Sequence, residues 1–359
     1  MKRLLLIILF SGTALHTWAQ CAQTLRLARA TYEQGRLHEI ESQLKGCLEP
    51  TEKGGFAKEE KQLRVEALKI LTMSYIYLEE PQKADAAMLS LKKADPYYRP
   101  NPEVDPAEFV ALYNSYREEP VYRIGVRLGV NFTQPNIQEL VTVVELAEDS
   151  QFKQAVAFQF GAAVDLPITL FKQIKKWTLH GELLYQQRRF EIVQLEDRGI
   201  NPAEPDKKLL NEFEGAESQT ALSLPVTLEY KFMEKKFNPY IALGFSTDYL
   251  LSSKLTAERK RTDEPGVPER GLDLERERIN LSALAAAGVK LPVGPGFIVF
   301  EVRYAHGLTN VSTPETAFVN QSLALDYGYA VPVFKQSSLS IAGSYIFNKH
   351  NPKKITRKK

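Results

Sequence analysis

Residues 122–132 read YRIGVRLGVNF, and this stretch decides the fold of most of the chain. Every second position from Tyr122 to Phe132 is apolar, and the positions between them hold arginine, glycine and asparagine. Successive side chains of a β-strand point to opposite faces, so this alternation predicts a strand with one apolar and one polar face. One such strand also fits a soluble sandwich, and the number of similar segments therefore decides the architecture.

Seven more segments follow, most of which alternate in the same way, at residues 155–166, 177–190, 220–232, 239–250, 279–291, 297–307 and 338–347. Their lengths match the roughly 9–11 residues that a tilted strand needs to cross a bilayer. Long links follow the odd-numbered segments, and short links follow the others, over residues 167–176, 233–238 and 292–296. We therefore predict an eight-stranded antiparallel up-and-down transmembrane β-barrel over residues 119–348. Two of its long links, 193–218 and 251–277, are charged and contain prolines, and we expect them to be loops facing water.

The polar faces of these segments predict what fills the barrel. Ten charged residues are expected to point inwards: Arg123, Arg127, Glu182, Arg188, Glu229, Lys231, Asp248, Lys290, Glu301 and Arg303. Eight strands enclose only enough space for side chains, so we expect a packed network of ion pairs and no open pore. His180 is expected to be a partner of Glu182 within it. Aromatic residues near the strand ends suit interfacial girdles: Tyr122, Trp177, Tyr240, Tyr249, Tyr345 and Phe347.

The chain begins with a basic residue pair, an apolar run and small residues, in MKRLLLIILFSGTALHTWAQ. This pattern predicts a secretory signal peptide over residues 1–19. The two cysteines, Cys21 and Cys47, then lie in an oxidising compartment, and we expect them to form a disulfide. A lipidated Cys21 is the alternative, although Ala19 and Gln20 fit a lipoprotein signal poorly.

Apolar residues recur at helical spacing over residues 20–118, which predicts a module of helix pairs. The first pair is marked by Leu25, Ala28, Tyr32, Leu37, Ile40, Leu44 and Leu48, with a break at Gly35. The second is marked by Leu63, Ala67, Leu68, Leu71, Tyr75, Ala84, Ala87 and Leu91, and a third helical stretch covers residues 105–116. The module resembles tetratricopeptide helix pairs in its Tyr32-x-x-Gly35 turn and its Asp95-Pro96 stop. Such pairs can form a groove for a partner peptide, or they can cap the barrel; both readings stay open.

Four stretches resemble a known family: LSLPVTLEYKF (222–232), FNPYIALGFSTDYLL (237–251), AGVKLPVGPGFIVFEVRYAHGLTNV (287–311) and SLSIAGSYIF (338–347). They look like the outer-membrane β-barrel proteins of Bacteroidetes-type bacteria, including PorT-like members tied to secretion. The resemblance implies a barrel in the outer membrane. It leaves the task of the protein open. A basic tail, residues 349–359, follows the last strand, and we expect it to be solvated, with lipid headgroups or a periplasmic partner as the alternative.

Composition and motifs argue against several functions. The net charge is +2, so no overall field points to nucleic acid. We find no zinc spacing, phosphate loop or nucleophile elbow, and we expect no catalytic residue, metal or cofactor. The main hypothesis is a non-enzymatic barrel that anchors a periplasmic helical module for docking to a protein of an assembly, secretion or surface-organisation complex. The alternatives are a lipid or small-molecule binder or lipid-modifying enzyme at the outer rim, near His306, and a soluble periplasmic protein.

Overall fold

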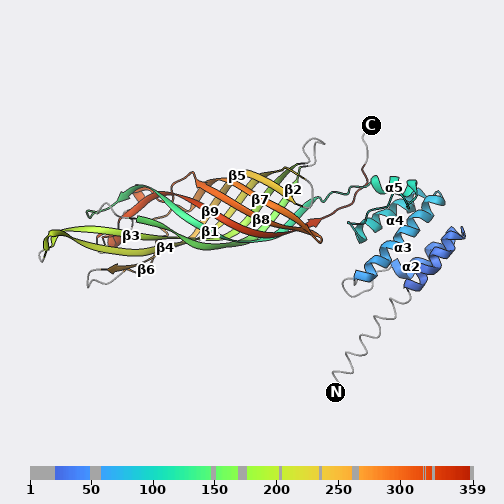
Figure 1. Cartoon of the computed structure of the whole chain (residues 1–359), viewed down its shortest axis with the longest axis horizontal. Helices are drawn as coiled ribbons and strands as arrows, with labels where there is room; N and C mark the ends of the chain where they lie inside the picture. The colour runs from blue at the N-terminus through green and yellow to red at the C-terminus, as the bar shows by residue number, and fades with distance from the viewer. Residues whose placement is uncertain are drawn as a thin grey trace, which may run out of the picture. The chain divides into compact units, whose positions relative to one another are not determined.

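The computed structural model of the chain describes residues 21–48, 58–146, 151–168, 176–201, 204–233, 237–260, 267–317, 319, 321–325 and 328–355. The expected signal peptide lies outside the described residues. The chain divides into two compact units (Figure 1). We call residues 1–120 with 350–359 the helical unit, and residues 121–349 the strand unit.

The helical unit consists of short and medium-length helices. A helix over residues 21–33 ends before Gly35, whose φ of 77° favours glycine. It is followed by the 3-10 turn η1 (Leu37–Glu39) and by helices α2 (Ile40–Leu48), α3 (Lys58–Tyr77), α4 (Pro81–Ala94) and α5 (Ala107–Asn114). Their apolar faces form two buried clusters, one around Leu44 and Leu71 and one around Met88 and Phe109. The predicted helices are thereby confirmed, whereas the tetratricopeptide-like repeat stays a prediction.

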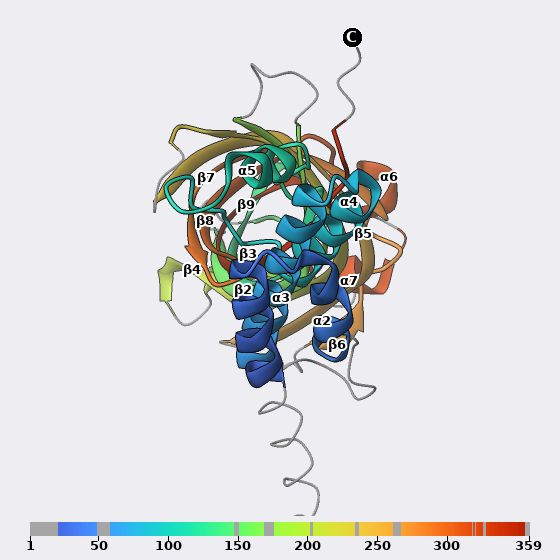
Figure 2. The same ribbon diagram turned by 90° about the vertical axis from the view of Figure 1, so that its right-hand side faces the viewer.

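The strand unit contains a closed ring of eight antiparallel strands, which Figure 2 shows from one end. The strands are β1 (Tyr122–Val141), β2 (Gln151–Pro167), β3 (Trp177–Asn201), β4 (Glu204–Lys231), β5 (Asn238–Lys260), β7 (Ile279–Val293), β8 (Gly296–Gly307) and β9 (Val331–Lys349). Each strand pairs with the next one of this list, and the ring closes because β1 also pairs with β9. Gly125, for example, is opposite Ala163 of β2 and Ile346 of β9. The eight predicted strands and the barrel are confirmed.

The outer face of the ring carries an apolar band. Val126, Leu128, Phe158, Leu243 and Phe245 all point outwards, and each exposes more than half of its surface. A contiguous apolar surface of this kind is unusual on a soluble monomer and is the expected outer face of a barrel in lipid. No helix among the described residues is long and apolar enough to cross a membrane.

The strands continue beyond the apolar band, into residues that the sequence predicted as charged loops. β3 runs to Asn201 and β4 begins at Glu204, so residues 193–201 and 204–218 belong to two paired strands that form a long hairpin. β5 likewise runs to Lys260, and the short strand β6 (Val267–Gly271) pairs with it within residues 251–277. The prediction of loops over these two ranges is therefore wrong for most of their described residues.

The polarity of the wall inverts in this extension, which explains the error. Arg189 and Glu191 are exposed on the outer face, whereas Phe190 and Ile192 between them are buried. A wall surrounded by water keeps its apolar side chains inside, while a wall in lipid keeps them outside. The inward residues form one cluster with segments from the β8–β9 connection, including helix α7 (Gln321–Leu325): Phe190, Ile192, Phe213, Leu255, Ala257, Leu272, Val311, Leu323, Tyr329, Val331 and Phe334.

Tyr240 departs from its predicted place in an interfacial girdle. Its side chain points into the barrel and is 2% exposed, and its hydroxyl donates a hydrogen bond to Glu301 Oε2 at 2.7 Å. Even-numbered residues of this part of β5 face the interior, so its strand position decides its direction. Other predicted aromatic residues do pair near a strand end, since the rings of Tyr345 and Phe347 lie 4.5 Å apart.

Candidate functional site

The barrel interior contains a network of charged side chains at the level of the apolar band. Of the ten residues predicted to line it, Lys231 is partly buried and nine are buried: Arg123, Arg127, Glu182, Arg188, Glu229, Asp248, Lys290, Glu301 and Arg303. The residues come from six different strands, and alternation along each strand turns them inwards.

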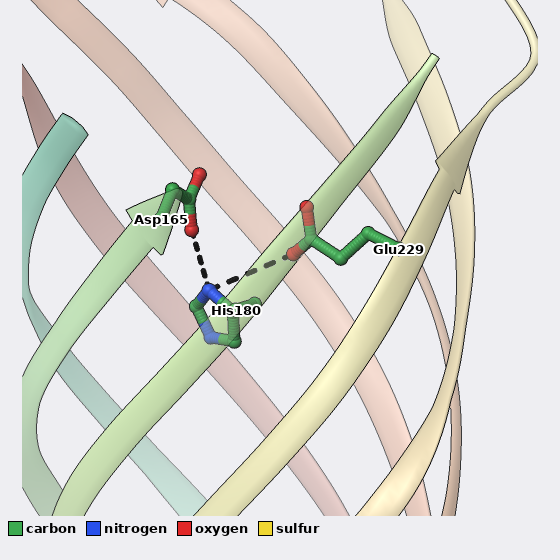
Figure 3. A group of neighbouring side chains, drawn as sticks. All are labelled: Asp165, His180 and Glu229. Carbon is green, nitrogen blue, oxygen red and sulfur yellow. Dashed lines mark hydrogen bonds and ion pairs between the residues drawn. The ribbon is translucent and has the colours of Figure 1, made fainter. Parts of the chain in front are cut away.

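Lys290 of β7 lies at the centre of one half of this network. Its Nζ donates hydrogen bonds to Asp165 Oδ2 at 2.7 Å and to Glu229 Oε2 at 2.6 Å. The same two carboxylates lie beside His180 of β3 (Figure 3). Asp165 Oδ1 is 2.5 Å and Glu229 Oε1 is 3.7 Å from His180 Nδ1. Four strands, β2, β3, β4 and β7, are thus joined through one buried ammonium group and one buried imidazole ring.

His180 is also bonded through its other ring nitrogen. Its Nε2 lies 2.6 Å from Glu182 Oε1, as the sequence predicted for this pair. An ionised carboxylate only accepts hydrogen bonds, so both ring nitrogens must donate. The geometry therefore describes an imidazolium cation held between Asp165 and Glu182.

Two arginines form the other half of the network. Arg127 lies 3.0 Å from Glu182 and 2.8 Å from Glu301, and Arg303 lies 2.7 Å from Glu182 and 2.9 Å from Glu301. The two halves together contain four carboxylates: Asp165, Glu182, Glu229 and Glu301. If His180 is protonated, five cations face them: Lys290, Arg127, Arg303, His180 and Arg123, the last at 3.7 Å from Asp165. Each of these charges has at least one partner of opposite sign, as buried charges require.

The three residues of Figure 3 are also the kinds of ligand that bind metal ions. One ligand atom each from Asp165, His180 and Glu229 lies within 4.8 Å of the others. However, Lys290 Nζ already lies within 2.7 Å of both carboxylates, and a histidine binds a metal as the neutral imidazole. A divalent cation would have to displace the ammonium group and remove a proton from His180. The arrangement fits an ion-pair network better than a metal centre.

A second group of polar residues lies further along the interior. Arg188 is paired with Asp248, whose carboxylate also accepts a hydrogen bond from Ser246 at 2.8 Å. A hollow of only about 20 Å³ lies beside this pair and is lined largely by serine, glutamine and arginine side chains. This volume is comparable to that of a single water molecule. Side chains therefore fill the described interior here.

Asp165 was not among the residues predicted to line the barrel interior, although the strand alternation around it places it there. The residue was within the predicted second strand, and it alternates with the outward residues Val164 and Leu166 in the same way as the other lumen residues. It accepts hydrogen bonds from both Lys290 and His180, and it is completely buried.

His306, the residue considered for a rim site, lies on the outer face and is exposed. Its Nδ1 is 3.4 Å from Ser337 Oγ, and that hydroxyl accepts a hydrogen bond from Asn136 Nδ2 at 2.7 Å. Its ring is stacked near Tyr304, with 6.3 Å between centroids. A serine next to a histidine is a part of many nucleophilic sites. Among the described residues, no carboxylate forms an ion pair with His306.

The helical unit has two hollows on its surface, and both are lined in part by Tyr75. The first is about 620 Å³ and is lined by His38, Glu41, Ser42, Lys45, Leu48, Leu71 and Tyr75. The second is about 210 Å³ and is lined by Tyr75, Ile76, Glu79, Glu80, Pro81, Ala84, Asp85, Leu112 and Lys354. Each combines apolar residues with charged ones, as binding surfaces for peptides do.

The Cys21–Cys47 disulfide is present in this unit and joins the first helix to α2. Because the Cys21 sulfur takes part in this bond, it is not available for a lipid, and the alternative of a lipidated Cys21 does not hold in this structure.

The side chains of the basic tail are mostly exposed over its described residues, but its main chain is paired with the helical unit, which was not predicted. Residues 350–355 pack on the helical unit as an extended segment. Arg117 N donates to Lys353 O at 3.0 Å, and Ile355 N donates to Ser115 O at 2.7 Å. Lys354 Nζ lies 2.5 Å from Asp85 Oδ2. Main-chain pairing leaves no pattern of side chains, so this contact could not be predicted from the sequence.

Lys92 of α4 is a buried cation without a carboxylate partner among the described residues. It is 3% exposed, and its Nζ lies 3.5 Å from the centroid of the Tyr113 ring. Its ammonium group has no hydrogen-bond acceptor in the described part of the chain. Burial lowers the pKa of Lys92 to about 8, because the ammonium group loses its hydration and the negative charge of Glu118 offsets only a part of this loss.

We expect Lys92→Met to stabilise the helical unit at pH 7. Lys92 has a lower pKa in the folded than in the unfolded state, so its contribution to stability rises with pH from about 8 to 10.5, the ordinary value. Between pH 7 and pH 10 the gain is on the order of 2 kcal/mol. Thermal unfolding of the full chain in detergent, followed by helix circular dichroism, should show a stability difference between variant and wild type that shrinks over this pH range. Lys93→Met, at an exposed neighbouring position, is the control. A difference that does not depend on pH contradicts this account.

Comparisons with known proteins concern the strand unit. The model of a family described as "Outer membrane protein beta-barrel domain" matches residues 121–313. No curated protein matches the chain. Among solved structures, Neisserial surface protein A is 8% identical, with a TM-score of 0.31, over 63% of this chain and 96% of that one. OprG from Pseudomonas aeruginosa is 14% identical, with a TM-score of 0.32, over 64% and 98%. The protease OmpT from Escherichia coli is 8% identical, with a TM-score of 0.34, over 63% and 96%.

Proposed function

Because the chain belongs to the outer membrane protein beta-barrel domain family, we propose that its barrel anchors a helical docking unit at the bacterial outer membrane. Family membership makes it an outer-membrane β-barrel protein. The docking function, the periplasmic position of the helical unit and the absence of catalysis are our proposal. In it, the helical unit binds a protein of an envelope assembly, secretion or surface-organisation complex.

The observation that carries the proposal is the contrast between the interior of the barrel and the surface of the helical unit. The interior is occupied by an ion-pair network at the level of the apolar band and by an apolar cluster beyond it. A barrel filled in this way is suited to anchoring, because a solute would have to displace paired buried charges. The hollow of about 620 Å³ on the helical unit, in contrast, is large enough for several side chains of a partner.

With an even number of strands, the chain enters and leaves the barrel at the same rim. Tyr122 at the start of β1 is opposite Lys349 at the end of β9, so the segments that connect to residues 1–120 and 350–359 leave the barrel at the same rim. Short turns on the same rim, such as the one at Gly294, are typical of the periplasmic side of outer-membrane barrels. In our proposal, the helical unit and the tail are therefore periplasmic.

Site-specific cross-linking in living cells tests the docking function. A photoreactive residue in place of Lys45, which lines the larger hollow, is expected to give one protein adduct. The same residue in place of Lys93, which lines neither hollow, is the matched control. Protease added to intact cells should leave the helical unit uncut until the outer membrane is permeabilised. Absence of an adduct from the hollow, or cutting of the helical unit in intact cells, contradicts the proposal.

The second candidate function is lipid binding or lipid modification at the outer face of the barrel. The observation in its favour is the contact of His306 with Ser337, which lies just beyond the outward-facing Tyr304 and Leu339 of the apolar band. This candidate predicts that His306→Ala abolishes the phenotype of the protein in cells and leaves the cross-link from position 45 intact. The docking proposal predicts that the His306→Ala variant keeps the phenotype of the wild-type protein.

A further inference from the structure

The C-terminal tail shows how the helical unit can hold an extended chain. Residues 353–355 run antiparallel to residues 115–117, with Lys354 opposite Tyr116. Asp85 of α4 lies beside this pair, because it contacts both Lys354 Nζ and the Tyr116 hydroxyl, the latter at 3.1 Å. We call residues 115–117 together with Asp85 the tail site.

The contacts of the tail within this site do not depend on a buried side chain. The Lys354 side chain is 51% exposed, Asp85 is 32% exposed, and the following Ile355 is exposed. What holds residues 353–355 is main-chain hydrogen bonding, which any extended peptide can supply, and an ion pair at the surface. An interaction of this kind is exchangeable. Outside the tail site, the His350 ring lies edge-on to Tyr97, with 5.2 Å between centroids.

The surface next to the tail site favours a basic occupant. Lys354 reaches the rim of the 210 Å³ hollow, where Glu79, Glu80 and Asp85 supply carboxylates. The floor of the hollow is apolar, with Ile76 and Leu112 among its residues. Lys83 forms an ion pair with Glu80 at 2.9 Å, which leaves Glu79 and Asp85 to face an incoming cation. A lysine with an apolar neighbour therefore suits this surface.

We propose that the tail site is a docking site for an extended, lysine-bearing segment of a partner protein, and that the chain's own tail occupies it until that partner binds. This inference rests on the proposed docking function of the helical unit and names the chemistry of the partner. Since a tethered tail has an effective concentration in the millimolar range, it competes with weak ligands and yields to a partner that also fills the neighbouring hollow.

The test measures the binding of a labelled synthetic peptide with the sequence of residues 350–359 to the full chain in detergent. Wild type is expected to bind it weakly, because its own tail competes. A chain lacking residues 350–359 should bind it about tenfold more tightly, and the full-length variant Lys354→Glu should bind it more tightly than wild type by a smaller factor, because the main-chain bonds of its tail remain. Adding Asp85→Asn to the tail-deleted chain should weaken binding about threefold. Glu103→Gln, at an exposed position outside the tail site, is the control and should leave it unchanged.

Each outcome supports or overturns the tail site, provided that the variants are folded. Helix circular dichroism checks the folding of the helical unit, and heat-dependent gel mobility checks that of the barrel. Equal binding to wild type and to both tail variants, or insensitivity to Asp85→Asn, overturns the tail site. Failure of the peptide to bind any variant also overturns it. If the cross-link from position 45 persists in that case, the docking function stands without the tail site. If the cross-link is absent too, both proposals fail.

Discussion

Lys290→Met is expected to destabilise the barrel by about 3–5 kcal/mol, the usual cost of removing one partner from a buried ion pair. Lys290 is 2% exposed and is bonded to Asp165 and Glu229 at once. Without the ammonium group, Asp165 keeps His180, but Glu229 keeps only a contact with His180 at 3.7 Å. The barrel would therefore contain a buried carboxylate that is almost unpaired.

Urea unfolding of the refolded barrel in detergent or lipid vesicles measures this effect. The chain has two tryptophans, and one of them, Trp18, falls in the predicted signal peptide, so the fluorescence of the mature protein reports on Trp177 in β3. Lys254→Met is the matched control, because Lys254 pairs with Glu269 at the surface, where an ion pair contributes at most about 1 kcal/mol. The double variant Lys290→Met, Glu229→Gln should recover a part of the lost stability. If Lys290→Met behaves like the control, the network does not stabilise the fold.

Much of the barrel could be predicted because strand alternation is a local property of the sequence. The direction of each side chain follows from its position in a strand, so Arg127, Glu182 and Lys290 could be placed in one interior before any pairing was known. Their partners within that interior could not be predicted, since the strand register brings together Arg127 and Glu301, which are 174 residues apart.

The extension of the strands could not be predicted from composition. Residues around Glu191 and Lys254 carry the charges of a typical loop, and the same alternation that marks the membrane strands is present there with its polarity reversed. Reading these segments correctly requires knowing that this part of the wall faces water. The cluster that fills this part also uses Leu323 and Tyr329 from the β8–β9 connection, for which the sequence predicted no role.

The disulfide of the helical unit is expected to give the other large effect. Cys21 and Cys47 are 26 residues apart, and closing a loop of that length stabilises a fold by about 3.5 kcal/mol in the chain-entropy model. The gain is large for a small unit, because the first helix and α2 supply only a part of a modest apolar core. Replacing both cysteines by serine should therefore lower the midpoint of thermal unfolding followed by helix circular dichroism, whereas the heat-dependent gel mobility of the barrel should not change.

Reduction of the wild-type protein should reproduce the loss of stability seen in the double serine variant, and the same reductant should have no effect on that variant. This control separates the covalent bond from the burial of the two side chains, because reduction removes the bond and leaves both residues in place. Intact mass before and after reduction should differ by two hydrogens and show no attached lipid. Equal unfolding midpoints for the oxidised and reduced wild-type protein would mean that helix packing, and not the disulfide, stabilises the helical unit.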